Sequence, residues 1–194
     1  MEDSLNPDRL VVGVTNPRSE ELLRAVFAPM ISAGIPFLVT DLATAELVKA
    51  AANAFLATKI SFINAMAEIA EVSGADATQL AKAIGYDERI GNKFLRNGVG
   101  FGGGCLPKDI RALIARAEEL GVGESVSYLH EIDKINLRRR DRVITLLTEE
   151  LGSLQGRKVL ILGAAFKPDS DDVRDSPALD IAAQLHAAGA EVVV

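Results

Sequence analysis

Short apolar runs occur near the two ends of the chain, whereas its middle carries apolar residues at helical spacing. Residues 10–14 and 36–40 are apolar, and the amphipathic stretch 19–32 between them stops before Gly34. This order predicts a strand, one helix and a second strand. Since such a unit normally belongs to a parallel sheet of several strands, we expect residues 1–40 to be the end of a larger α/β domain.

The next stretch predicts one long helix. Asp41 and Thr44 can each cap a helix N-terminus, and residues 45–73 contain neither Pro nor Gly until Gly74. Apolar residues lie all round this helix, so we expect it to be buried on more than one side.

Shorter helices follow, separated by an irregular segment. Asp76 predicts the cap of a helix that ends at Gly85, and the glycine-rich residues 86–104 predict a loop. Pro107 suits the first turn of the next helix, which we expect to run to Gly121.

Residues 125–151 predict a second long helix with a polar middle. This middle carries the group Arg138, Arg139, Arg140 and Arg142. Because a run of like charges on a helix is usually a solvated face, we interpret this group as solvent-exposed.

The chain then returns to an α/β pattern. It predicts a strand at 158–162, a loop at 164–175, a helix capped by Ser176 and Pro177 that ends at His186, and a strand from 191. The predicted fold is therefore mainly α, with a helical middle of long helices and partial α/β, Rossmann-like pieces at both ends. The boundaries are 1–40, 41–152 and 153–194.

Composition narrows the class of protein. The formal net charge is −6, which argues against nucleic acid as a partner. Only 5% of residues are aromatic, which argues against an aromatic-rich β-sandwich. With no apolar run of about 18 residues and no signal-peptide pattern, we expect a cytoplasmic protein that has no contact with membranes. One cysteine and two distant histidines, His130 and His186, indicate no disulfide and no metal site.

Cys105 is a candidate nucleophile. It follows a glycine-dense loop and precedes a predicted helix N-terminus, where the helix dipole and Lys108 favour a thiolate. The alternative is a structural cysteine beside a flexible loop. Backbone without side chains allows a ligand to approach closely, and four glycines provide it: Gly100, Gly102, Gly103 and Gly104.

Lys49 and Asn53 lie four residues apart, on one face of the first long helix. A lysine and a carboxamide there can hold an oxyanion or a water molecule. The alternative is a lysine that reaches solvent and an asparagine that is satisfied in the core. Asp109 can equally serve the first turn of its own helix.

The acidic loop after the third predicted strand resembles no EF-hand. Counted from Asp169, its sixth position is Arg174 instead of Gly, and its twelfth is Asp180 instead of Glu. The dinucleotide fingerprint is also absent from this loop. Lys167 and Arg174 can hold phosphates at the end of a parallel strand, or they can be solvated loop charges.

Four segments, taken in order, resemble the UDP-glucose/GDP-mannose dehydrogenase family. They are NPDRLVVGV, AELVKAAANAFLATKISFINAMAEIAE, YDERIGNKFLRNGVGFGGGCLPKD and VLILGAAFKPDSDDVRDSP. The resemblance implies that UDP-glucose or a similar nucleotide-sugar is oxidised twice by NAD, through a thioester on a cysteine. GDP-mannose is the nearest alternative substrate.

The resemblance also implies roles for particular residues. Cys105 is the nucleophile, while Lys49, Asn53 and Asp109 position water and stabilise oxyanions. The remaining roles are sugar contacts from Phe94, Arg96, Phe101 and Gly102, a contact of Arg89 with a neighbouring subunit's site, Lys167 on the nucleotide-sugar, and Lys108 and Arg174 near NAD.

The same resemblance makes residues 1–40 the end of an NAD-binding domain, 41–152 a central domain that forms a homodimer, and 153–194 the start of a UDP-sugar-binding domain. Gly104 stands where many members of the family have serine. The resemblance also places the family's glycine-rich NAD loop before Met1 and most of its UDP-binding domain after Val194. We therefore expect a fragment that has no dehydrogenase activity by itself. The alternative from another functional class is a catalytically silent dimerisation module. A thiol-dependent hydrolase would need a histidine near Cys105, and this sequence has none close to it.

Overall fold

The computed structural model describes residues 5–194 and divides the chain into two compact units. The first unit ends at Ala52, and the second runs from Asn53 to Val194. The boundary between them falls within one continuous helix. Over the described residues, every helix is too short or too polar to span a lipid bilayer.

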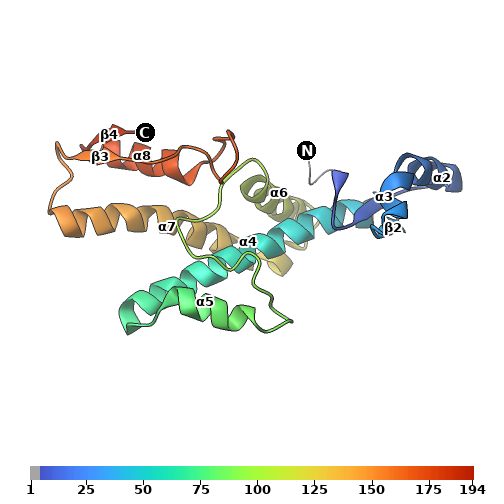
Figure 1. The fold of residues 1–194 in the computed structure, drawn as a ribbon, viewed down its shortest axis with the longest axis horizontal. Helices are drawn as coiled ribbons and strands as arrows, with labels where there is room; N and C mark the ends of the chain where they lie inside the picture. The colour runs from blue at the N-terminus through green and yellow to red at the C-terminus, as the bar shows by residue number, and fades with distance from the viewer. Residues whose placement is uncertain (1–4) are drawn as a thin grey trace. The chain divides into compact units, whose positions relative to one another are not determined.

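The first unit contains two parallel strands, as the apolar runs predict (Figure 1). β1 (Leu10–Gly13) pairs with β2 (Phe37–Thr40), and Leu10 lies opposite Phe37. None of residues 5–52 is fully buried. Two strands and their helices are therefore too few to enclose a core of their own.

The expectation of a single helix at 19–32 is wrong, because this stretch forms α2 (Pro17–Val26) and α3 (Ala28–Ser32). Pro29 is the physical reason. It has no amide hydrogen, and its ring would clash with the carbonyl of Ala25 in a continuous helix. Asn16 caps α2 through a 2.9 Å hydrogen bond from a backbone amide of the first turn.

The long helix is confirmed as α4 (Leu42–Ser73). Of the two possible caps, Asp41 is used, since its Oδ1 accepts a hydrogen bond from the Thr44 amide at 2.8 Å. Gly74 ends the helix with a φ of 76°, a backbone conformation that favours glycine.

Burial of α4 is incomplete in this chain. Its buried residues begin at Asn53 and continue to Ala70. Phe55, Phe62 and Ile69 follow one another at intervals of seven and are 65%, 47% and 56% exposed. Because seven residues make two helical turns, these three form one exposed stripe, which we call the α4 stripe.

The remaining helices follow the predicted order. They are α5 (Ala77–Gly85), α6 (Leu106–Glu119), the short 3-10 helix η1 (Gly123–Val126) and α7 (Tyr128–Leu151). Asp76 caps α5 through bonds from the amides of Thr78 and Gln79, at 2.8 and 3.0 Å. The second long helix was expected from residue 125, whereas its first turn is the separate η1.

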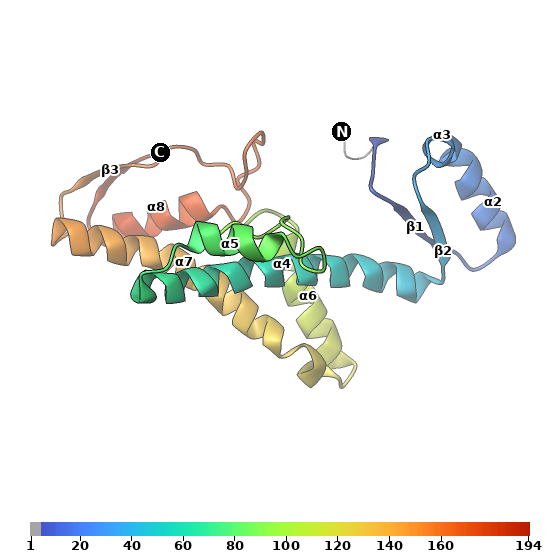
Figure 2. The same ribbon diagram turned by 60° about the horizontal axis from the view of Figure 1, so that its bottom comes forward.

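Two groups of buried residues hold these helices together. Ala57 on α4, Ile110 on α6 and Leu129 on α7 are fully buried in one cluster, which also receives the ring of Phe101. In the other, Ile63 of α4 contacts α5, which lies beside it (Figure 2).

The C-terminal segment forms a second pair of parallel strands, β3 (Lys158–Leu160) and β4 (Glu191–Val193), with α8 (Pro177–Ala187) between them. α8 lies along the second half of α7 (Figure 1). Ser176 precedes α8, but it is not a side-chain cap as expected, because its hydroxyl donates instead to the carbonyl of Ala164 at 2.6 Å.

The interpretation of the arginine group as a solvated face is wrong for two of its four members. The side chains of Arg139 and Arg140 are only 9% and 4% exposed. Arg139 donates to the carbonyl of Gly98 and to Glu71. The other two, Arg138 and Arg142, form ion pairs at the surface. Consecutive helical residues point about 100° apart, so one run of arginines can supply both a surface face and a buried one.

We predict that Leu129→Ala lowers the free energy of unfolding by about 2–5 kcal/mol, because it opens a cavity at a fully buried site. The matched control is Leu137→Ala, on the same helix but 38% exposed, which should change this free energy by about 0.5 kcal/mol. Urea unfolding measures both. Equal losses in the two variants would contradict the placement of the core.

Candidate functional site

Cys105 lies at the N-terminal end of α6, as the sequence predicts. It occupies the N-cap position and is exposed, and its carbonyl accepts the amide of Asp109 at 2.8 Å. Pro107 in the first turn is buried and anchors the start of the helix. The first turn of α6 begins directly after Cys105, and the positive end of the helix dipole favours negative charge at that end.

Two of the predicted site residues meet although they are 56 positions apart. The Asn53 amide donates to the Asp109 carboxylate at 2.6 Å, and Asn53 is 8% exposed. Lys108 Nζ lies 3.3 Å from the same carboxylate. Lys49 is exposed on α4 in the first unit, one helical turn before Asn53.

The glycine loop is covered by the protein itself. The sequence suggests that these glycines leave the backbone open to a ligand, but a Cβ on Gly103 would lie 2.7 Å from the Phe166 ring. A Cβ on Gly104 would lie 2.6 Å from Cζ of Arg174. Gly102 faces the carbonyl of Asp175, and Gly100 faces Asn136. These glycines therefore make room for residues 166–177 and α7.

Two α7 residues that the sequence reasoning missed hold the loop in place. The side-chain oxygen of Asn136 accepts a hydrogen bond from the backbone amide of Phe101 at 2.6 Å. Its side-chain nitrogen donates a hydrogen bond to the Phe101 carbonyl at 3.0 Å. Arg140 donates to the same carbonyl at 3.1 Å. A signal was available in the sequence, because both residues share the helical face of the buried Leu129 and Ile132.

Arg174 lies beside the cysteine. Its carbonyl accepts the Gly103 amide at 2.9 Å, and its guanidinium lies over Gly104. Hydrogen bonds from the Arg174 side chain and backbone amide lower the pKa of Asp172 from 3.8 to about 2. Asp172 raises the pKa of Arg174, and Cys105 adds a smaller effect of the same sign.

The residues predicted to contact the nucleotide-sugar or a neighbouring subunit's site differ in how exposed they are. Phe101 is buried in the core, so its ring is not free to touch a ligand. Phe94 is 43% exposed and has a φ of 64°, which is strained for an aromatic residue. The exposed Lys167 lies 5.6 Å from the centre of the Phe166 ring. Arg89 is exposed and paired with Asp87 at 2.7 Å.

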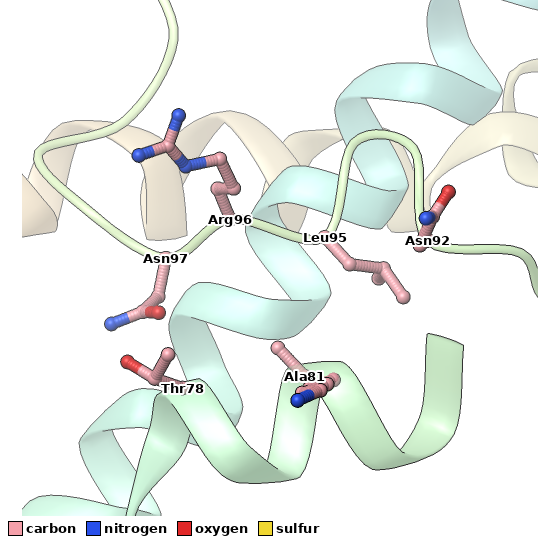
Figure 3. Close-up of a pocket in the computed structure, with 7 residues that line it drawn as sticks. Thr78, Ala81, Asn92, Leu95, Arg96 and Asn97 are labelled. Carbon is pink, nitrogen blue, oxygen red and sulfur yellow. The ribbon is translucent and has the colours of Figure 1, made fainter. Parts of the chain in front are cut away.

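Arg96 lines a cleft of about 410 Å³ between α5 and the segment before the glycine loop (Figure 3). Leu95 points toward α5, and Asn97 lies near Thr78, whereas the Arg96 guanidinium extends away from α5. Another cleft, of about 420 Å³, lies in the first unit at the end of β1, near Thr15. Neither of these two clefts includes Cys105.

Comparison with known proteins places the chain in a family. Residues 43–138 match the central domain of the UDP-glucose/GDP-mannose dehydrogenase family, and residues 160–194 match its UDP binding domain. The chain belongs to this family of oxidoreductases, as the sequence motifs indicate.

Particular relatives are similar over nearly the whole chain. It is 49% identical to the UDP-glucose 6-dehydrogenase of Rickettsia typhi, over 93% of this chain and 42% of that protein. It is 42% identical to the UDP-glucose 6-dehydrogenase TuaD of Bacillus subtilis, over 99% of this chain and 41% of TuaD. A solved UDP-glucose dehydrogenase from Pyrobaculum islandicum has a TM-score of 0.92 and 41% identity, over 98% of this chain and 43% of that one. The chain thus spans less than half the length of these relatives.

We predict that Arg174→Met raises the pKa of Asp172 from about 2 toward 3.8, because the variant removes the side-chain hydrogen bonds. Since the pKa is depressed in the folded protein, this pair stabilises the fold above pH 3.8, and the stabilisation is lost as pH falls toward 2. NMR titration of the Asp172 carboxyl carbon measures the change.

Asp76 is the internal control for this titration. Backbone amides of Gln79 and Thr78 lower its pKa, and the variant does not touch them. An Asp172 that already titrates at 3.8 in the unsubstituted chain would contradict the contact with Arg174.

Proposed function

We propose that this chain is the part of a UDP-glucose 6-dehydrogenase that carries the catalytic thiol. The observation that carries the proposal is the placement of Cys105 at the start of α6, whose first turn holds Asp109 against Asn53 at 2.6 Å. The similarity to UDP-glucose 6-dehydrogenases that are 42–49% identical supports it. The domain boundaries at 40 and 152 belong to the same proposal, and the two family matches support them.

In this proposal the substrate is UDP-glucose, and its C6 alcohol is converted to a carboxylate in two oxidations. NAD, when bound, accepts one hydride in each oxidation, so two NAD molecules are reduced per sugar. After the first oxidation, the Cys105 thiolate adds to the C6 aldehyde and forms a thiohemiacetal. The second oxidation leaves a thioester, and water then releases the carboxylate and restores the thiol.

Asn53 and Asp109 act on the oxygen atoms in this sequence. The Asn53 amide has a second hydrogen that can point to an oxyanion, because the Asp109 bond fixes its orientation. Asp109 can accept a proton from the attacking water. Lys49 adds positive charge for the oxyanion, as the family resemblance implies.

Lys108 and Arg174 fit the anionic part of NAD. Both side chains are exposed, at 73% each, and both lie near the N-terminal end of α6. Two cations beside free helix amides provide the charge and donors that a pyrophosphate requires. Phe94, Arg96 and Lys167 remain the proposed contacts of the nucleotide-sugar, and Arg89 the contact with a partner's site. Phe101 and Gly102 contribute through the position of the loop backbone.

A chimera tests this function. We predict that TuaD whose matching segment is replaced by this chain reduces two NAD per UDP-glucose, and that Cys105→Ser in the chimera abolishes formation of the acid. NADH absorbance and mass spectrometry of the sugar measure the two outcomes. Unsubstituted TuaD is the control for the assay.

Three results would contradict the proposal. A folded chimera with no NADH formation favours the catalytically silent dimerisation module. Oxidation of GDP-mannose in preference to UDP-glucose favours the alternative substrate. Undiminished acid formation by the Cys105→Ser chimera would exclude Cys105 as the nucleophile.

The same proposal includes a homodimer formed through the helical middle. The α4 stripe of Phe55, Phe62 and Ile69 supports it, because three large apolar side chains on one helix face are costly to leave in water. A second copy of the same helix offers the same stripe, as a two-fold interface requires.

We predict that the chain is a dimer in solution and that Phe62→Asp, which places a charge in the stripe, shifts it to monomer. Light scattering at micromolar concentration measures the mass. The control is Leu120→Asp. Leu120 follows the end of α6, is 60% exposed and lies outside the stripe. A monomeric unsubstituted chain, or dissociation in both variants alike, would contradict this interface.

A further inference from the structure

We propose that Asn136 and Arg140 are positioning residues for Cys105: they lock the backbone of Phe101 and hold Arg174 beside the cysteine. This inference rests on the proposed role of Cys105, and it assigns that role two supporting residues that do not touch the thiol. One chain of contacts leads from α7 to the glycine loop and then to Cys105.

The first contact fixes the start of the loop. Asn136 is 1% exposed, and its side-chain amide pairs with both the N–H and the C=O of Phe101. A carboxamide with two bonds to one residue has a single orientation, and so have the two peptide groups on either side of that residue. The loop therefore leaves Phe101 in one direction.

The second contact joins three segments on one buried charge. Arg140 donates to the Phe101 carbonyl at 3.1 Å, to Asp175 at 3.2 Å and to Asp180 at 3.1 Å. Asp175 lies before α8 and Asp180 within its first turn. A buried guanidinium needs such partners, so Arg140 requires the glycine loop and the start of α8 to be close together.

The third contact carries this constraint to the cysteine. Asp175 has a φ of 46°, an unfavourable backbone for a residue other than glycine, and its ion pair with Arg140 helps to hold it there. Its neighbour Arg174 is then directed at the loop, where its carbonyl binds the Gly103 amide and its guanidinium covers Gly104. Without Arg140, the Asp175 carboxylate keeps only the longer ion pair with Arg111, at 4.0 Å. The strained Asp175 can then relax, and Arg174 can move away from Cys105.

A purely structural role predicts something different. Buried ion pairs are often replaced by apolar residues with little loss of stability. If Arg140 only filled space, Arg140→Met would leave the chemistry of Cys105 unchanged in the folded protein. If it positions Arg174, the same variant changes that chemistry while the chain stays folded.

The test is the rate at which iodoacetamide alkylates the folded chain. Cys105 is the only cysteine in the sequence, so the rate reports a single site. We expect Arg140→Met to slow alkylation at neutral pH about two- to five-fold, the effect of one nearby charge at a partly exposed site. Arg140→Lys keeps the charge and should restore part of the rate.

Arg142→Met is the matched control. It removes a charge from the same helix, where Arg142 pairs with Glu71 and Glu149, and it should leave the rate unchanged. Arg174→Met should slow alkylation as much as Arg140→Met, and the double variant should be no slower than either. Thermal melts show whether each variant is folded at the temperature of the assay.

An unchanged rate in folded Arg140→Met, or additive losses in the double variant, would overturn the proposal. If Arg140→Met does not fold, Asp175→Asn decides, because this isosteric change weakens the same contact at a half-buried side chain. An unchanged rate in that variant also overturns it. An inactive chimera, together with slower alkylation of Cys105 in Arg140→Met, would refute only the proposed function. An active chimera, together with an unchanged alkylation rate in Arg140→Met, would refute only the positioning role.

Discussion

The buried guanidinium of Arg140 joins the glycine loop to the start of α8 within the second unit. Arg140 is removed from water, and its charge is balanced only because Asp175, Asp180 and the Phe101 carbonyl converge on it. These partners come from the glycine loop, from the residue before the cap of α8 and from the first turn of α8 itself. The position of the loop, and with it the position of Cys105, follows from this requirement.

The glycines of the loop make this close packing sterically possible. Gly102, Gly103 and Gly104 allow Asp175, Phe166 and Arg174 to lie directly on the loop backbone, where a side chain would push them away. A serine in place of Gly104 would need the Arg174 guanidinium to shift, which is a small change because that group is the end of a flexible side chain. The loop therefore depends on residues some seventy positions further along the chain.

Electrostatics gives the site a defined polarity. Arg174 and Lys108 lie near Cys105 at the N-terminal end of α6, while the carboxylate of Asp109 is occupied by Asn53 and Lys108. The positive end of the helix dipole thus lies on the side of the thiol, and the Asp109 carboxylate lies one helical turn further along the chain. This arrangement agrees with membership of a dehydrogenase family that is recognised by its central and UDP binding domains.

Much of the local structure was determined by the sequence itself. The cap at Asp76, the stop at Gly74 and the place of Pro107 in the first turn of α6 depend on neighbouring residues, and all are found where the pattern predicts them. The family and the candidate nucleophile can also be recognised from the sequence, because both depend on contiguous motifs. Helical spacing from Leu129 and Ile132 indicates an inward direction for Arg140, but only the tertiary structure decided which arginines find buried partners. Arg139 and Arg140 do, whereas Arg138 and Arg142 pair at the surface. A run of arginines has the same local chemistry at every position, and the partners that distinguish them come from distant segments whose proximity only packing creates.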